Sequence, residues 1–185
     1  MSLKIETGKF KNKYIETVND PKTRYTTSML RQALMNMFDF NGAIILELFA
    51  GSGIFSFEAL SNGAQKSVLV DISSKSVKSI LENAKTLHVL KNIRVIKSDY
   101  RKVFSKLSSE RFDFIFADPP FNLGYIDELL KLLDKNFYIL EEEGYIIIEK
   151  AKNENFIGAF ENLTLVETRD YGDVELLILQ RIKVE

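Results

Sequence analysis

The pattern of apolar and polar positions changes its period along the chain. Apolar residues recur at helical spacing over residues 28–38, and short runs of consecutive apolar residues follow from residue 43 onward. A 3.6-residue period indicates an amphipathic helix, whereas a short apolar run between turn signals is typical of a buried strand. The pattern predicts strands at 43–49, 67–72, 93–99, 112–118 and 145–150, and further helices at 54–62, 74–88, 123–136 and 154–160.

The predicted strands and helices alternate along the middle of the chain, and both ends depart from this alternation. Residues 3–18 are interpreted as two short strands around Lys11-Asn12, because asparagine tolerates the positive φ that a tight turn needs. Two final strands meet at the turn of residues 171–173, which is too short for a crossover, so they should be antiparallel. The whole pattern predicts an α/β, Rossmann-like fold with a mainly parallel seven-stranded sheet and a final antiparallel strand. We expect an N-terminal β-hairpin extension and connection at 1–26, followed by one domain at 27–185.

Charge is distributed unevenly along the 185 residues. The net charge is −1, but residues 1–31 carry +4 and the remainder carries −5. A basic arm on an acidic body suits a polyanionic partner, although a solvated hairpin would show the same pattern.

Composition narrows the classes of function. Cysteine is absent and His88 is the only histidine, which excludes a disulfide framework, thiolate catalysis and any Ser-His-Asp relay that does not use His88. No apolar run approaches the roughly 20 residues of a membrane helix, and the first residues lack the apolar centre of a secretory signal. No cluster has metal-ligand spacing. We therefore expect a cytoplasmic protein with neither a membrane partner nor a metal, and a monomer by default.

The first predicted strand–loop–helix passage carries a cofactor signal. Gly51 and Gly53 allow a sharp turn, and Asp71 ends the next strand 20 residues after Gly51, where an acid can accept the hydroxyl hydrogens of a ribose. Ser56 stands where a dinucleotide fingerprint requires a third glycine. Glu47, near the end of the first strand, could accept a hydrogen bond from a cationic amino group. An amino-acid nucleoside such as S-adenosylmethionine fits these acids better than a pyrophosphate does.

Three more residues extend the predicted cofactor site. Asp99 follows the third strand and is placed to meet an adenine amino group, and Tyr100 could offer a backbone N–H. Phe49 belongs mainly to the core and could also touch the cofactor. The alternative for Glu47 and Asp99 is that they cap helices or strand ends.

The segment Asp118-Pro119-Pro120-Phe121 ends the fourth predicted strand, beside the first. Two prolines stiffen the turn, and a carboxylate with a neighbouring carbonyl can each accept one N–H of an exocyclic amine. Phe121 can stack on an extruded base. The segment therefore predicts an amino-group methylation site, with a rigid β-to-α turn as the structural alternative.

The sequence resembles the RsmD-type methyltransferases, which are class I enzymes dependent on S-adenosylmethionine. The resemblance rests on LELFAGSGIFSFEALSNGA, VLVDIS, FDFIFADPPF and RYTTSMLRQALMNM. It implies methylation of N2 of one guanine in small-subunit (16S) ribosomal RNA, within the subunit or an assembly intermediate. By position it implies a target-base site at residues 118–121, a cofactor site at Gly51, Gly53, Asp71 and Asp99, and an RNA-binding arm.

The resemblance also gives expected roles to residues of the RNA-binding arm, and some positions of the arm and of the cofactor site depart from the family pattern. Lys9, Lys11 and Lys13 suit the RNA-gripping hairpin. Residues 24–27 match the entry to the first helix, although Tyr25 replaces a usual proline. Glu47 replaces an aspartate and Asp71 a glutamate, and both keep the charge. We expect Arg24, Thr26 and Arg31 near the RNA or the mouth of the cofactor site.

Three other functions remain open from the residues alone. The same catalytic set serves methylation of adenine N6 in DNA or RNA. A non-catalytic RNA-binding module would fit the basic arm, but Asp118 and the glycine loop are intact. A nicotinamide oxidoreductase is disfavoured by Ser56.

Overall fold

Seven strands form one sheet in the computed structural model, which describes residues 2–18 and 25–182. In chain order the strands are β3 (Ile44–Leu48), β4 (Lys66–Asp71), β5 (Ile93–Lys97), β6 (Phe112–Ala117), β7 (Leu140–Ala151), β8 (Leu163–Tyr171) and β9 (Val174–Arg181). Their spatial order is β5-β4-β3-β6-β7-β9-β8. The strands β3 to β7 run parallel, and β9 lies antiparallel to both of its neighbours, which confirms the predicted fold class.

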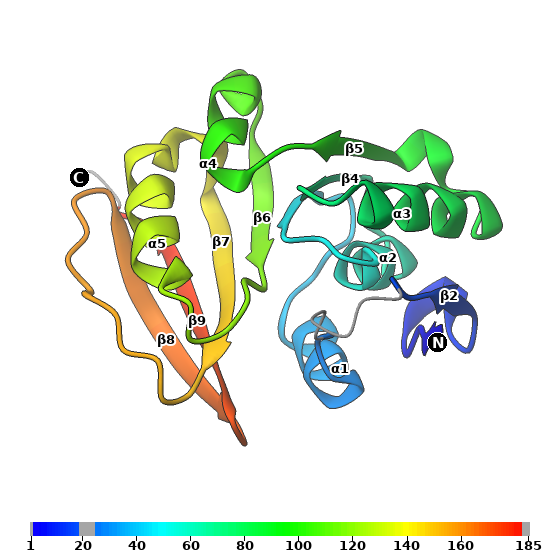
Figure 1. The fold of residues 1–185 in the computed structure, drawn as a ribbon, viewed down its shortest axis with the longest axis horizontal. Coiled ribbons are helices and arrows are strands. Elements are labelled where there is room, and N and C mark those ends of the chain that lie inside the picture. The colour runs from blue at the N-terminus through cyan, green and yellow to red at the C-terminus, as the bar shows by residue number, and fades with distance from the viewer. Residues whose placement is uncertain (1, 19–24, 183–185) are drawn as a thin grey trace.

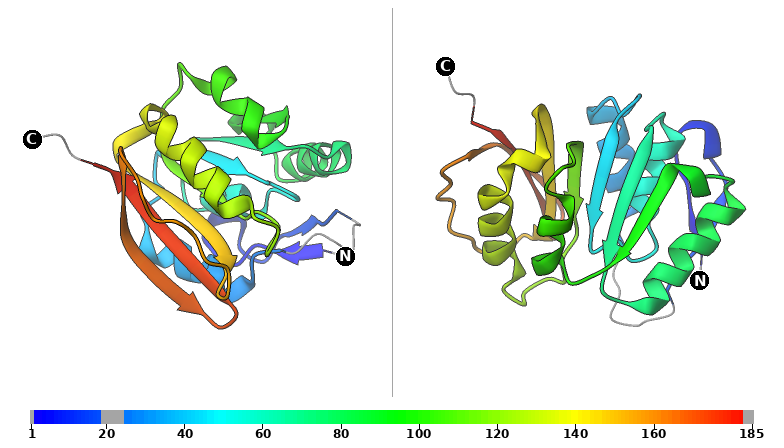
Figure 2. Two further views of the ribbon diagram at one scale, coloured as in Figure 1. Left: turned by 60° about the vertical axis from the view of Figure 1, so that its left-hand side comes forward. Right: turned by 90° about the horizontal axis from the view of Figure 1, so that it is seen from above.

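Helices cover both faces of this sheet (Figures 1 and 2). One face carries α1 (Ser28–Met37), α2 (Ile54–Ser61) and α3 (Ser74–Thr86), and the other carries α4 (Tyr100–Val103) and α5 (Tyr125–Lys135). Side-chain caps fix two of the helix starts: Thr27 accepts the Leu30 N–H at α1, and Ser73 accepts the Lys75 and Ser76 N–H groups at α3.

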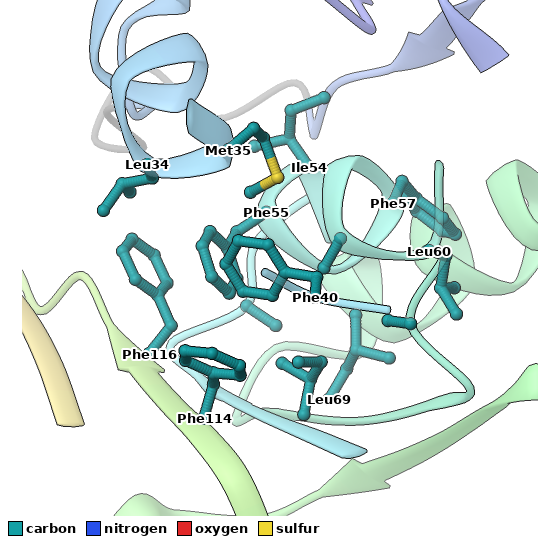
Figure 3. Packing of buried hydrophobic residues seen from close by; sticks show 14 of the residues in the cluster. Leu34, Met35, Phe40, Ile54, Phe55, Phe57, Leu60, Leu69, Phe114 and Phe116 are labelled. Atoms are coloured by element: carbon teal, nitrogen blue, oxygen red, sulfur yellow. The ribbon is translucent and has the colours of Figure 1, made fainter. Parts of the chain in front are cut away.

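Phenylalanine side chains fill the core between α1, α2 and the sheet (Figure 3). The rings of Phe55 and Phe116 stack with centroids 4.0 Å apart, and Phe40 packs against both Phe55 and Phe114. Because Phe116 lies two residues before Asp118, this packing on the α1 and α2 face of the sheet holds the end of β6 in place.

The N-terminal hairpin lies beside α2 and α3 (Figure 1) and forms its own two-stranded sheet. Its strands are β1 (Ser2–Lys4) and β2 (Tyr14–Glu16), and Asn12 has a φ of 68°, as expected for the turn. A short 3₁₀ helix, η1 (Gly8–Phe10), lies between the strands. Ile5, Phe10 and Ile15 are buried in the same core as α1 and α2.

A buried ion pair attaches the hairpin to the domain. Arg31 of α1 and Glu58 of α2 have side chains 3% and 0% exposed, with Nε and Oε1 3.3 Å apart. Glu58 also accepts the backbone N–H groups of Glu6 and Thr7, and Arg31 donates to the Lys4 carbonyl. Backbone groups of the hairpin therefore complete the hydrogen bonding of two buried charges.

One secondary-structure expectation was wrong, and one strand is longer than expected. Residues 154–160 form no helix. The Ile157 N–H within this segment donates to Asp127 of α5, and the Glu161 N–H just after it donates to Asp134. The strand predicted at 145–150 extends over Leu140–Ala151. Within the part of the chain that the structure describes, no helix combines the length and apolarity needed to cross a membrane.

The buried pair gives a stability prediction. Glu58→Gln should lower the free energy of unfolding by about 3 kcal/mol, because it removes the closer carboxylate partner of the buried Arg31 guanidinium and leaves only Glu6, whose Oε1 lies 3.9 Å from Nη2. Glu82→Gln is the control, since the Lys78–Glu82 pair is 78% and 64% exposed and should contribute about 0.5 kcal/mol or less. Urea unfolding monitored by circular dichroism measures both, and equal effects would contradict a structural role for Glu58.

Candidate active site at the carboxyl edge of the sheet

Two adjoining hollows open where β3, β4 and β6 end. The larger has a volume of about 670 Å³, and the smaller about 130 Å³. Both are lined by Phe49, Asp71, Ile72 and Pro120. In an open α/β sheet this edge, beside the point where strand order reverses, is the usual ligand site.

Asp71 shapes the glycine loop between β3 and α2. Its Oδ2 accepts the Gly51 N–H and its Oδ1 accepts the Ser73 N–H, both at 2.8 Å. Gly51 has a φ of 54° and lines the larger hollow. A carboxylate oxygen has more than one acceptor position, so these bonds leave Asp71 able to accept ligand hydroxyl groups.

Gly53 does not line either hollow, contrary to expectation. It has a φ of 77° at the start of α2, and an added Cβ would lie 2.9 Å from Leu69 Cδ2 and 3.0 Å from Phe57 Cε2. The glycine is therefore needed for backbone geometry and close packing on the core side of the loop.

Glu47 lies in the floor of the larger hollow and is 3% exposed. Burial raises the pKa of its carboxyl to about 7, while the hydrogen bond from Ser56 N at 3.0 Å to Oε2 opposes the rise. The nearby Asp71 charge raises the pKa further. A cationic group bound in this hollow would stabilise the ionised form.

Aromatic and charged side chains wall the smaller hollow. Tyr100 and Tyr125 stand with Phe49 around it, and the Arg101 guanidinium lies 4.7 Å from the Tyr100 ring centroid. Asp99 lines it too, accepting the Arg101 N–H at 2.8 Å and pairing with the guanidinium at 3.2 Å. Asp99 therefore does cap α4, and its predicted contact with an adenine amino group stays a prediction.

The Asp-Pro-Pro-Phe segment follows β6 directly and lines the larger hollow with all four residues. Pro119 is buried and Phe121 is partly buried. The Thr26 hydroxyl oxygen lies 3.4 Å from Asp118 Oδ2. The structure thus brings the predicted base site and Asp71 to one cavity, although they are separated by 47 positions in the chain.

The predicted RNA-contacting residues divide into different environments. Lys9, Lys11 and Lys13 are exposed on the hairpin, and Thr26 is buried against the cavity. Arg24 lies outside the described residues. Arg31 does not lie at the surface: its buried guanidinium bonds to Glu58 and to backbone carbonyls, so the expected contact with RNA is corrected to a structural role. Its bond to the Thr26 carbonyl places it behind the larger hollow, which Thr26 lines.

Two residues that sequence reasoning missed connect the hairpin to the site. Glu58 holds the hairpin, and the signal was an isolated acid in the otherwise uncharged segment 54–61. Asn83 of α3 accepts the Glu16 N–H at 2.8 Å and donates to the carbonyls of Glu16 and Ser52. The role of Asn83 could not be predicted from the sequence, because an asparagine within a helical pattern does not indicate which loops lie beside it.

Comparisons with known proteins identify the family of the chain. The family model described as "Conserved hypothetical protein 95" matches residues 3–180. A Bacillus subtilis protein named "Putative rRNA methyltransferase YlbH" is 30% identical over 92% of this chain and 94% of its own. The Escherichia coli "Ribosomal RNA small subunit methyltransferase D" is 27% identical over 97% and 90%. A solved structure titled "Putative methyltransferase yhhF from Escherichia coli" superposes with a TM-score of 0.80 at 28% identity, covering 98% of both chains.

The buried acid gives a prediction about stability and pH. Because the folded-state pKa of Glu47 is about 7 and its ordinary value is 4.5, its stabilising contribution is full below pH 4.5 and is lost as pH rises through 7. Relative to Glu47→Gln, whose amide oxygen can still accept the Ser56 N–H, the wild type should gain up to about 3 kcal/mol between about pH 8 and about pH 5. Urea unfolding across this range checks it, and parallel pH profiles would contradict it.

Proposed function

The chain belongs to the "Conserved hypothetical protein 95" family, the RsmD-type methyltransferases, and on that premise we propose that it transfers a methyl group from S-adenosylmethionine to N2 of a guanine in small-subunit ribosomal RNA. The observation that carries the proposal is the shared cavity: Asp71, at the end of β4, and Asp118, after β6, line the same hollow. A cofactor site and an amine-binding site are thereby adjacent.

The residues around the two hollows fit S-adenosylmethionine. Asp71 would hold the ribose, the aromatic walls and Asp99 of the smaller hollow would hold the adenine, and Glu47 would face the amino-acid end. The donor set is acidic, which suits a ligand that carries an ammonium and a sulfonium and does not suit a pyrophosphate. When bound, the cofactor supplies an electrophilic methyl group.

The Asp118 segment would orient the amine that receives the methyl group. An exocyclic amine on a purine is a poor nucleophile because its lone pair is delocalised into the ring. The Asp118 carboxylate and the Pro119 carbonyl would each accept one N–H, which directs the lone pair and stabilises positive charge developing on nitrogen. Phe121, beside them, would stack on the extruded base, an interaction worth about 1–3 kcal/mol.

The hairpin would bind the RNA backbone beside this cavity. Lys9, Lys11 and Lys13 are exposed, and Lys9 and Lys13 place their ammonium groups 4.9 Å and 5.2 Å from the Phe10 ring. The strand β2 leads directly to Val18, which lines the larger hollow. A phosphate bound by the hairpin lysines would therefore be connected to the larger hollow through the short segment from β2 to Val18.

The proposal is tested by transfer of tritium from labelled S-adenosylmethionine to small ribosomal subunits, to naked 16S RNA and to DNA, all from cells that lack this protein. Label in N2-methylguanosine of subunit RNA supports it. Label in N6-methyladenosine would keep the site but change the target base, and label in DNA would change the substrate class. Either result contradicts the proposal.

The catalytic assignment predicts a specific loss. Asp118→Ala should reduce methyl transfer by at least about a hundredfold, because the amine loses one of its two acceptors, while cofactor affinity should change little. Asp113→Ala is the matched control. Asp113 lies at the start of β6, at the opposite edge of the sheet from Asp118, and accepts the Ile44 N–H, so any loss of stability should leave the turnover of folded enzyme near wild type. Single-turnover kinetics measure methyl transfer, and titration with S-adenosylhomocysteine measures cofactor affinity, in both variants. Unchanged turnover in Asp118→Ala would remove Asp118 from the mechanism.

The hairpin assignment predicts an altered salt dependence. Replacing Lys9, Lys11 and Lys13 with alanine should weaken RNA binding and reduce the slope of log K against log salt by roughly one per lost phosphate contact. The control triple variant replaces Lys106, Lys131 and Lys135, which are exposed on the part of the chain that covers the other face of the sheet. If both triple variants change the slope equally, the hairpin makes no particular contact with RNA.

A further inference from the structure

We infer that Thr26 is a positioning residue that orients the Asp118 carboxylate, and this inference rests on the proposed function. Thr26 immediately precedes Thr27, the N-cap of α1, and it is 3% exposed. Its hydroxyl oxygen lies 3.4 Å from Asp118 Oδ2, across 92 positions of sequence. The sequence placed Thr26 near the RNA or the mouth of the cofactor site, and in the structure its hydroxyl faces a carboxylate in the larger hollow.

The chemistry of the contact fixes its direction. An ionised carboxylate has acceptors and no hydrogen to donate, so the threonine hydroxyl must be the donor. A donor held at Oδ2 restricts rotation about the Cβ–Cγ bond of Asp118 and therefore sets the direction of Oδ1. Contacts of this kind are long in ligand-free sites and shorten when the substrate binds.

The backbone of Thr26 is held independently of its side chain. Arg31 Nη1 donates to the Thr26 carbonyl at 2.5 Å, and the same guanidinium is fixed by Glu58 and by the Lys4 carbonyl of the hairpin. A change to the Thr26 side chain leaves all of these bonds in place. The hydroxyl can therefore be removed without undoing the hairpin network.

Loss of the hydroxyl should affect the catalytic step more than binding. Asp118 would still be present but less well oriented, and misplacement of a reacting or orienting group by about 1 Å can cost about a hundredfold in rate. Thr26→Val keeps the shape and removes the donor, so kcat should fall by roughly ten- to a hundredfold. The KM for RNA, the affinity for S-adenosylhomocysteine and the Tm should stay near wild type.

Two further variants make this test decisive. Thr26→Ser retains the hydroxyl and should restore kcat to within about threefold of wild type. Thr27→Val, one residue along, removes the cap that accepts the Leu30 N–H and should lower the Tm without a comparable loss of kcat. A raised KM for RNA with unchanged kcat in Thr26→Val would make Thr26 an RNA contact and would overturn the inference. Equal loss in the Val and Ser variants would overturn it as well.

A readout independent of RNA separates this inference from the proposed function. If the wild type transfers no methyl group to RNA, the proposed function fails, and crystal structures of the variants then decide the role of Thr26. We expect the torsion about the Cβ–Cγ bond of Asp118 to change in Thr26→Val and to stay the same in Thr26→Ser. An unchanged Asp118 in both variants would overturn it.

Discussion

Parallel pairing of β3 with both β4 and β6 brings the ends of three strands to one edge of the sheet. The register aligns Leu48 with Val70 on one side and with Ala117 on the other, so the residues that follow emerge together. A one-residue slip would turn the side chains of a strand to the other face. The buried apolar faces on both sides of the sheet, with stacked Phe55 and Phe116 on one of them, oppose such a slip.

The hairpin depends on that frame through buried polar contacts. Glu58, Arg31 and Asn83 bond to backbone groups of the hairpin and, in the case of Arg31 and Asn83, also to Thr26 and Ser52 beside the site. Backbone groups buried in this way cost free energy if their partners are lost. The hairpin is thus bound as an integral part of the domain, and an RNA-binding arm of this kind would have a defined position relative to Asp118.

Much of the fold was predictable because it follows from local periodicity. The alternating strands and helices, the antiparallel end and the positive φ of Asn12 were all predicted from the sequence. The absence of a helix at 154–160 was not predicted, because carboxylates of α5, about 30 residues earlier in the chain, accept the N–H groups of Ile157 and of Glu161 just beyond. For the site, the structure places Asp71 and Asp118 in one hollow, and their roles in cofactor binding and catalysis stay predictions. The buried position of Arg31 and the inward side of Gly53 depend on tertiary packing, which periodicity does not encode.

The central claim is that one cavity presents a methyl donor to Asp118. A crystal structure of the protein with S-adenosylhomocysteine tests it most directly. The account predicts the ribose hydroxyl groups at Asp71, the adenine in the hollow walled by Phe49 and Tyr100, and the sulfur facing the Asp118 segment. A ligand bound elsewhere, or a sulfur shielded from Asp118 by protein, would contradict it.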